Sequence, residues 1–185
     1  MAENISRESE SAKSEKEMLW EQKRKEIDEI KDGLDLGIDE HIKEAVTALN
    51  VYEFSTNQSC EGHLDKEEHG TTFPWVEIYA LQPKDWRKSK GEKKEKLEEE
   101  WRIENLQQQK RMMDLFAEFY QDRQTPFDAR LTFKNIGAFG GFRIQSFGGE
   151  VMKLLPLQEK EDKLKLYRKE LDNFTQFLKE KFLNQ

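Results

Sequence analysis

The segment PWVEIYAL, residues 74–81, restricts the fold of this chain more than any other segment. In an extended strand its apolar residues lie on both faces, with Val76, Ile78 and Ala80 on one and Trp75, Tyr79 and Leu81 on the other. A strand that is apolar on both faces is typical of the interior of a sheet, because both faces must be covered. The sequence therefore predicts a central strand with neighbours on either side.

Helical patterns flank this strand. The strongest is near the C-terminus, where the apolar residues recur at steps of 3 and 4 positions: Leu164, Tyr167, Leu171, Phe174 and Leu178. Weaker stripes predict one helix from about residue 16, a second that begins near residue 39, and a long third helix over about 92–123. Two polar residues, Asn105 and Gln108, interrupt the stripe of the long helix.

Three more segments have the character of strands, namely 53–60, 129–136 and 142–147. The glycine-rich GAFGG between the last two predicts a hairpin. We therefore predict an α+β fold with a small, mostly antiparallel sheet of about four strands that is covered by helices. Residues 1–15 are rich in Ser, Glu and Lys and have almost nothing to bury, so we expect a disordered tail before a single domain over residues 16–185.

The charge of the chain argues against broad binding to nucleic acids. The 38 acidic residues outnumber the 31 lysines and arginines and give a net charge of −7, which repels phosphates. A basic run between residues 84 and 96, with Trp86 inside it, is a local candidate for a phosphate-contacting patch. Glutamates from Glu92 onwards offset that charge, so we interpret the run as the solvated start of the long helix.

Three features indicate a cytoplasmic protein. The N-terminus lacks the apolar core of a signal peptide. No apolar run approaches the roughly 20 residues of a membrane span, so we expect no membrane partner. Cys60 is the only cysteine, so no disulfide can form within the chain, as is typical of a reducing compartment.

The loop STNQSCEGHLD, residues 55–65, contains the side chains best suited to catalysis or to binding a metal or a ligand. Gly62 permits a turn that other residues resist, and it separates Cys60 from His63. As a metal site, Cys60, His63 and His69 would offer sulfur and imidazole to Zn²⁺ and leave one position open. As a nucleophilic site, Cys60 would act as a thiolate with a histidine as its base, which makes Cys60 and His63 the catalytic candidates.

A third interpretation is a turn that binds a small polar molecule or a nucleotide. Trp75 would line that site, and the loop would supply Ser59, Cys60, Glu61, Gly62, His63 and Asp65. A fourth is purely structural, because a free cysteine is often buried as a small hydrophobic residue. We favour the binding module. The alternatives are an interaction or regulatory protein that uses its helices, and a zinc-dependent enzyme.

The segment ALNVYEFSTNQSCEGHLD, followed by PWVEI, resembles an uncharacterised bacterial protein family. That family carries a helix ending in Leu-Asn, then Thr, Ser-Cys-Glu-Gly-His and a Pro-Trp strand, and the likeness covers about Ile38 to Ile78. The resemblance implies that the loop is the hallmark of the family, but it implies no activity. A fainter likeness is to the wybutosine-synthesis methyltransferase family, which has Ser-Cys-x-Gly-Arg at a comparable turn. This chain has His63 in place of that arginine, which argues against a tRNA-modifying role and against use of S-adenosylmethionine.

The C-terminal helix is richer in apolar residues than one core face requires. The relevant residues are Phe174, Phe177, Leu178, Phe182 and Leu183. Two hypotheses follow: a spare apolar face would form a homodimer or bind a partner protein, or the extra residues pack on the N-terminal or the long helix.

Overall fold

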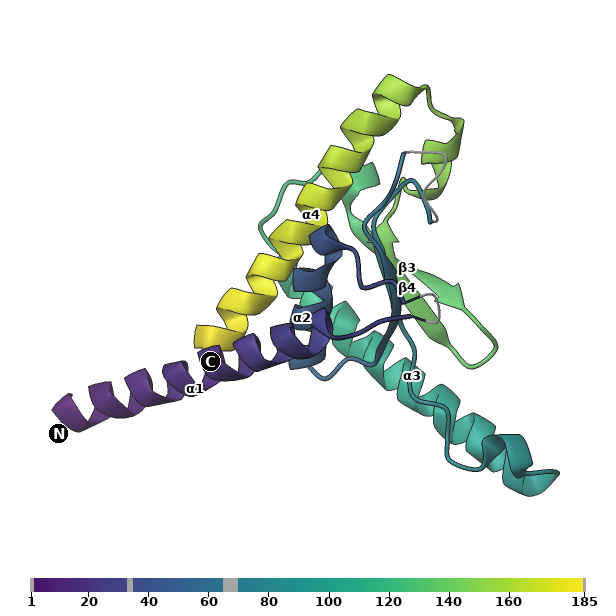
Figure 1. Ribbon diagram of the computed structural model, residues 1–185, viewed down its shortest axis with the longest axis horizontal. Coiled ribbons are helices and arrows are strands. Elements are labelled where there is room, and N and C mark those ends of the chain that lie inside the picture. Colours follow the sequence, from purple (N-terminus) through teal and green to yellow (C-terminus); the bar gives the residue numbers. More distant parts are fainter. Residues whose placement is uncertain (1, 33–34, 65–69, 185) are drawn as a thin grey trace.

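The computed structural model describes residues 2–32, 35–64 and 70–184. Two helices, two strands, a long helix, two further strands and a last helix follow one another along the chain (Figure 1). The α-helices are α1 (Ala2–Asp28), α2 (Lys43–Val51), α3 (Glu92–Phe119) and α4 (Leu157–Asn184), and the strands are β1 (Thr56–Cys60), β2 (Trp75–Ile78), β3 (Leu131–Ile136) and β4 (Gly141–Ser146). Short 3₁₀ helices are η1 (Glu40–Ile42), η2 (Trp86–Lys88), η3 (Phe127–Ala129) and η4 (Glu150–Leu154).

The strands pair antiparallel in the order β1–β2–β4–β3. β2 is therefore internal, as predicted, and all of its residues are buried. β3 and β4 form the predicted hairpin. β1 is an edge strand whose register with β2 shifts between Thr56 and Ser59, so it carries a bulge at Asn57 and Gln58. The α+β class and the mostly antiparallel sheet are confirmed.

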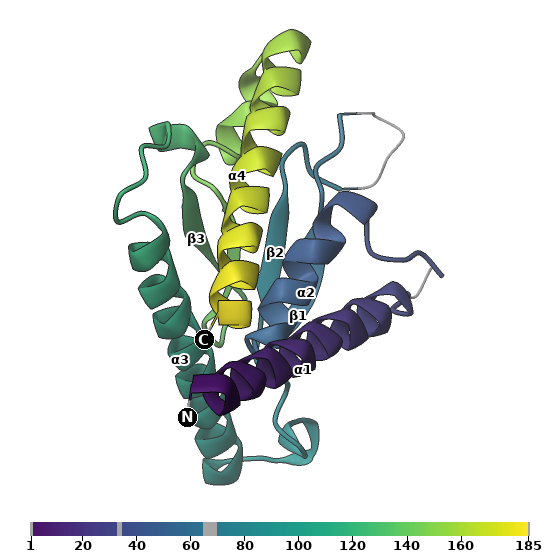
Figure 2. The ribbon, with the colours of Figure 1, turned by 90° about the vertical axis from the view of Figure 1, so that its left-hand side faces the viewer.

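The main core lies between the sheet and the helices. Figures 1 and 2 show α1, α2 and α4 together on one side of the sheet, while the first half of α3 extends beyond it. The sheet supplies Val76, Ile78, Phe142 and Ile144, and the helices supply Trp20, Leu49, Met112, Phe116 and Phe174 among others. The long helix and the C-terminal helix are both confirmed as elements. α3 ends at Phe119, earlier than predicted, where the Tyr120 hydroxyl accepts a hydrogen bond from the Leu131 N–H at 2.7 Å and ties the helix end to β3.

The N-terminal helix differs from its predicted start. α1 runs from Ala2, whereas the sequence predicts a helix from about residue 16 after a disordered tail. The packed part of α1 is the later one, where Trp20 and Ile27 enter the core. Figure 1 shows that the earlier part extends away from the rest of the molecule. Glu, Lys and Ala have a high intrinsic helix propensity, so helical geometry continues back through this polar segment.

The two polar residues that interrupt the stripe of α3 satisfy buried backbone groups. The Asn105 side chain accepts a hydrogen bond from the Ala80 N–H at 2.7 Å and donates to the Trp101 and Phe139 carbonyls at 3.0 and 2.9 Å. Gln108 accepts a hydrogen bond from the Ser55 N–H at 2.8 Å. Because these groups lie outside the strand ladders, the amides replace partners that the sheet does not provide.

The extra apolar residues of α4 pack against other parts of the same chain. The Phe182 ring lies 6.2 Å from the Trp20 ring and 6.3 Å from the Tyr52 ring. The Phe177 ring lies 5.4 Å from that of Phe119. Leu183 is half-buried. These contacts agree with the second hypothesis for this face, in which the extra apolar residues pack on the N-terminal or the long helix.

The basic run before α3 folds onto the helix. The Trp86 indole N–H donates to Glu98 at 3.1 Å, and the Lys94 ammonium lies 4.8 Å from the centre of the Trp86 ring. Trp86 is therefore engaged by residues of α3, in keeping with a solvated helix start. Among the described residues, none of the helices is both long enough and apolar enough to cross a membrane.

Asp128 connects η3 to α4. Its carboxylate accepts hydrogen bonds from the Lys163 ammonium and from the Tyr167 hydroxyl, the latter at 3.0 Å. Burial by itself would raise the pKa of Asp128, but the two donors outweigh it and hold the pKa below its ordinary value. A carboxylate with a lowered pKa contributes stability that is present above the pKa of the unfolded chain and is lost as pH falls through the folded one.

We therefore expect Asp128→Asn to lower the free energy of unfolding by about 1 kcal/mol at neutral pH and to reduce its loss on acidification. Urea unfolding of both proteins from about pH 7 to about pH 3 would measure this. The two stability curves should converge as the pH falls. Parallel curves over that range would contradict the role of the ionised Asp128.

Candidate functional site

The turn after β1 brings the sequence-predicted residues together. Cys60 is the last residue of β1, and Gly62 follows with φ of +85°. A Cβ at Gly62 would lie 2.7 Å from Leu164 Cδ1 and 2.9 Å from the Phe73 carbonyl carbon. The His63 N–H then donates to the Thr71 carbonyl at 2.7 Å. Gly62 thus permits the predicted turn, and it also lets the turn pack closely against Leu164 and Phe73.

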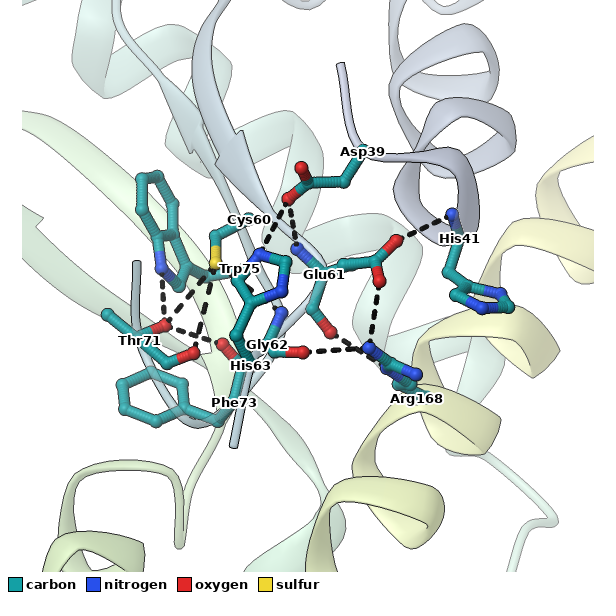
Figure 3. A network of polar contacts seen from close by, with 10 residues as sticks. All are labelled: Asp39, His41, Cys60, Glu61, Gly62, His63, Thr71, Phe73, Trp75 and Arg168. Atoms are coloured by element: carbon teal, nitrogen blue, oxygen red, sulfur yellow. Dashed lines mark hydrogen bonds and ion pairs between the residues drawn. The ribbon is translucent and has the colours of Figure 1, made fainter. Parts of the chain in front are cut away.

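The functional groups of Asp39, Cys60 and His63 converge (Figure 3). A carboxylate oxygen, the sulfur and a ring nitrogen all lie within 4.8 Å of one another. His63 Nε2 is 3.2 Å from Asp39 Oδ2, which also accepts the Glu61 N–H at 3.1 Å. Cys60 is 4% exposed, whereas the side chain of Asp39 is 33% exposed. The cluster is therefore buried at the sulfur and open at the carboxylate.

Glu61 points away from this cluster and anchors it to two helices. The guanidinium of Arg168, on α4, donates to the Glu61 carboxylate at 3.0 Å, to the Glu61 carbonyl at 2.9 Å and to the Gly62 carbonyl at 2.7 Å. The other carboxylate oxygen accepts the His41 N–H, in η1, at 2.9 Å. This Glu61–Arg168 clamp fixes the turn relative to α4 and to the start of η1, where Asp39 lies.

Thr71 and Trp75 form the opposite side of the cluster. The Trp75 indole N–H donates to the Thr71 hydroxyl at 2.9 Å, and that hydroxyl donates to the Phe73 carbonyl at 2.7 Å (Figure 3). The Arg143 guanidinium lies 3.8 Å from the centre of the Trp75 ring. Trp75 is buried, so its role as a stacking surface is limited on the side that Arg143 occupies.

A cavity of about 490 Å³ lies between β1 on one side and residues 30–32 and 36–39 on the other. Its apolar lining comes from Ile30, Leu36, Ile38, Val46 and Trp75, and its polar lining from Lys31, Asp32, Asp39, Thr56, Asn57, Gln58, Ser59 and Cys60. Gly37 and Gly70 complete the lining. The bulge of β1 places Asn57 and Gln58 at this cavity. Asp39 and Cys60 belong both to the lining and to the Asp39–Cys60–His63 cluster.

The structure thus unites some of the predicted site residues and separates others. Ser59, Cys60 and Trp75 line the cavity, and His63 joins Cys60 in the cluster. Glu61 and Gly62 bind to the protein itself. Asp65 and His69 lie outside the described residues, so the predicted set of Cys60, His63 and His69 is represented by its first two members.

Sequence reasoning missed Asp39, Thr71 and Arg168. Asp39 has the position of a helix N-cap, and it does precede η1, but it makes no capping hydrogen bond with its side chain. An N-cap aspartate whose side chain is used elsewhere has no signature in a sequence. Arg168 lies among many charged residues of α4, and only the packing of α4 against the turn distinguishes it.

Comparisons of the chain with protein-family models, with curated proteins and with solved structures found no match.

Proposed function

We propose that the protein binds a small polar molecule in the cavity that β1 forms with residues 30–32 and 36–39. The observation that carries the proposal is the cavity itself, which is of the size that small-molecule sites have and which adjoins the Asp39–Cys60–His63 cluster. Its lining combines apolar side chains with polar groups that can orient a ligand, as binding sites for small molecules do. Asp39 and Cys60 connect the cavity to His63.

The lining favours a small polar molecule over a nucleotide. Lys31 is the one cationic side chain among the described lining residues, and its ammonium pairs with Asp35 at 2.8 Å. A di- or triphosphate requires several donors or cations around its oxygens. Trp75 offers little free ring surface for a base because Arg143 occupies one face.

The alternative of an interaction protein that uses its helices has less support. The aromatic residues proposed for such a surface, Phe174, Phe177 and Phe182, pack against α1, α2 and α3. The apolar face of α4 is therefore largely occupied within the chain. Two side chains of the loop, Cys60 and His63, converge with Asp39 beside a cavity, which favours a binding role for the loop over a purely structural one.

A thermal-shift screen of the full chain would test the proposal. The panel contains amino acids, small carboxylic acids, sugars, nucleosides and nucleotides, and a ligand that binds the folded state raises the Tm by mass action. We expect a hit among the small polar compounds. In Gln58→Trp an indole replaces an exposed side chain of the cavity lining. The affinity of the protein for the compound found in the screen should then fall by about tenfold or more.

The matched control is Asn135→Trp, which places the same indole at an exposed position on the other edge strand, β3. This variant should keep the affinity within about twofold of wild type. A panel without any shift, or a ligand that binds both tryptophan variants equally well, would contradict binding in this cavity.

A further inference from the structure

The Asp39–Cys60–His63 cluster has the composition of a transition-metal site. Among the described residues it is the one group of three or more such ligands with converging atoms. Sulfur, imidazole and carboxylate are the ligands that Zn²⁺ takes in proteins, and three of them with one open position are typical of reactive rather than structural zinc sites. Thiolate and imidazole also disfavour Mg²⁺ and Ca²⁺, which prefer oxygen ligands.

The distances fit a tetrahedral ion. Zinc bonds to nitrogen and oxygen of about 2.0–2.1 Å place two such ligands about 3.3 Å apart. His63 Nε2 and Asp39 Oδ2 are 3.2 Å apart. The Cys60 sulfur lies within 4.8 Å of a ligand atom of each of the other two residues, so a contraction of up to about 1 Å by side-chain rotation would complete the set.

The surroundings hold the ligands in orientations that suit a metal. The Glu61 N–H donates to Asp39, and the Gly62 N–H donates to the Cys60 sulfur at 3.4 Å. Such hydrogen bonds orient ligands, and an N–H directed at sulfur stabilises a thiolate. Gly70 lies against the cluster, because a Cβ there would be 2.8 Å from the sulfur and 2.9 Å from His63 Cδ2.

The charges also balance. A thiolate and a carboxylate together neutralise a divalent ion, so the filled site has no net charge in its partly buried position. When the metal binds, the Cys60 thiol proton leaves to solvent. The proton through which His63 Nε2 pairs with Asp39 also leaves Nε2, so that Nε2 coordinates and the neutral imidazole carries its proton on Nδ1.

We propose that Asp39, Cys60 and His63 bind one Zn²⁺ per chain, with the fourth coordination position directed at the cavity. Asp39 and Cys60 both line that cavity, so a molecule inside it reaches the metal from their side. The ligand class follows: a small molecule with a metal-binding group such as a carboxylate. This last step rests on the proposed function, whereas the metal site itself stands on the cluster alone.

The test uses the full chain, stripped with a chelator and then titrated with Zn²⁺ or Co²⁺ alone. Co²⁺ occupies zinc sites and reports a thiolate ligand by a sulfur-to-cobalt charge-transfer band in the near ultraviolet. We expect this band to saturate at about one equivalent of metal. Zn²⁺ should displace the Co²⁺, raise the Tm and be held with a Kd that competition against a chromophoric chelator measures.

Three variants assign the ligands, and a fourth serves as the control. Cys60→Ser should abolish the charge-transfer band, and Asp39→Asn and His63→Gln should each weaken binding by more than about tenfold. His41→Gln changes an exposed histidine near the site and should stay within about twofold of wild type. Asp39→Asn retains an oxygen that can accept the Glu61 N–H, so it removes the charge and spares that hydrogen bond.

The wild-type spectrum already tests the metal site if a variant fails to fold. A folded protein that shows no charge-transfer band, or a band that survives Cys60→Ser, would overturn the metal site. Gln58→Trp should bind Zn²⁺ as wild type does, because it blocks the cavity and leaves the ligands in place. A cavity ligand that still binds the metal-free protein at full affinity would overturn the metal-directed ligand class and leave the proposed cavity function standing.

Discussion

Replacing Arg168 with alanine is expected to lower the free energy of unfolding by about 2–4 kcal/mol. Arg168 donates to the carboxylate and the carbonyl of Glu61 and to the carbonyl of Gly62, and the side chain of Glu61 is only 15% exposed. The truncation leaves a largely buried carboxylate and two carbonyls without these donors. Such groups then bear the full cost of their desolvation.

Urea or thermal unfolding of the variant would measure the loss. Arg102→Ala is the matched control, because Arg102 is also a helical arginine but its ion pair with Glu99 is exposed, so the cost should be about 0.5 kcal/mol or less. Arg168→Lys keeps the charge without the planar fork and should recover only part of the stability. If Arg168→Ala cost no more than Arg102→Ala, the clamp would have no structural role.

The second large effect is expected from Gly62→Ala, at about 2–5 kcal/mol. A side chain at a positive φ costs about 1–2 kcal/mol, and Gly62 has φ of +85°. Forcing an additional methyl group against packed atoms adds about 1–3 kcal/mol. The new Cβ would meet Leu164 Cδ1 at 2.7 Å and Phe73 backbone atoms at 2.9 and 3.0 Å, and the backbone atoms cannot rotate away.

Gly140→Ala separates the two contributions. Gly140 also has a positive φ, of +78°, but a Cβ there would meet its nearest atom, Asn105 Cβ, at an ordinary contact distance of 3.7 Å. Its stability loss therefore reflects the backbone conformation without a steric clash. We expect Gly62→Ala to be the more destabilising of the two in equilibrium unfolding. Equal losses would mean that the turn relaxes to accept the methyl group, and the close packing of Gly62 against α4 would then be unimportant.

The two effects explain why the turn can hold a precise cluster. Gly62 lets the chain reverse against Leu164 and Phe73, and Arg168 fixes the carbonyls of the same turn. Both therefore act on the position of Cys60 and His63 without taking part in the cluster. We expect variants at these two positions to reduce Co²⁺ affinity in step with their effect on the folded turn.

Local patterns in the sequence were sufficient for the elements and their class. The apolar faces of 74–81 predicted the internal strand β2, and the regular stripe from Leu164 to Leu178 predicted α4. Periodicity works here because burial of one face is repeated at every turn or every second residue. The end of α3 and the start of α1 were predicted less well, because caps, tertiary hydrogen bonds and intrinsic helix propensity set these limits.

The same distinction holds for the candidate site, of which one part was predictable from the sequence and the other was not. By itself, the sequence determined that Cys60, Gly62 and His63 share a tight turn at the end of a strand, because these residues are neighbours and a glycine permits the reversal. Only the tertiary structure decided that Asp39 is their third partner and that Arg168 holds the turn. Asp39 and Cys60 are far apart along the chain, and Arg168 is farther still. Hydrogen bonds among the start of η1, the turn after β1 and α4 bring them together, and such contacts leave no periodic trace in the sequence.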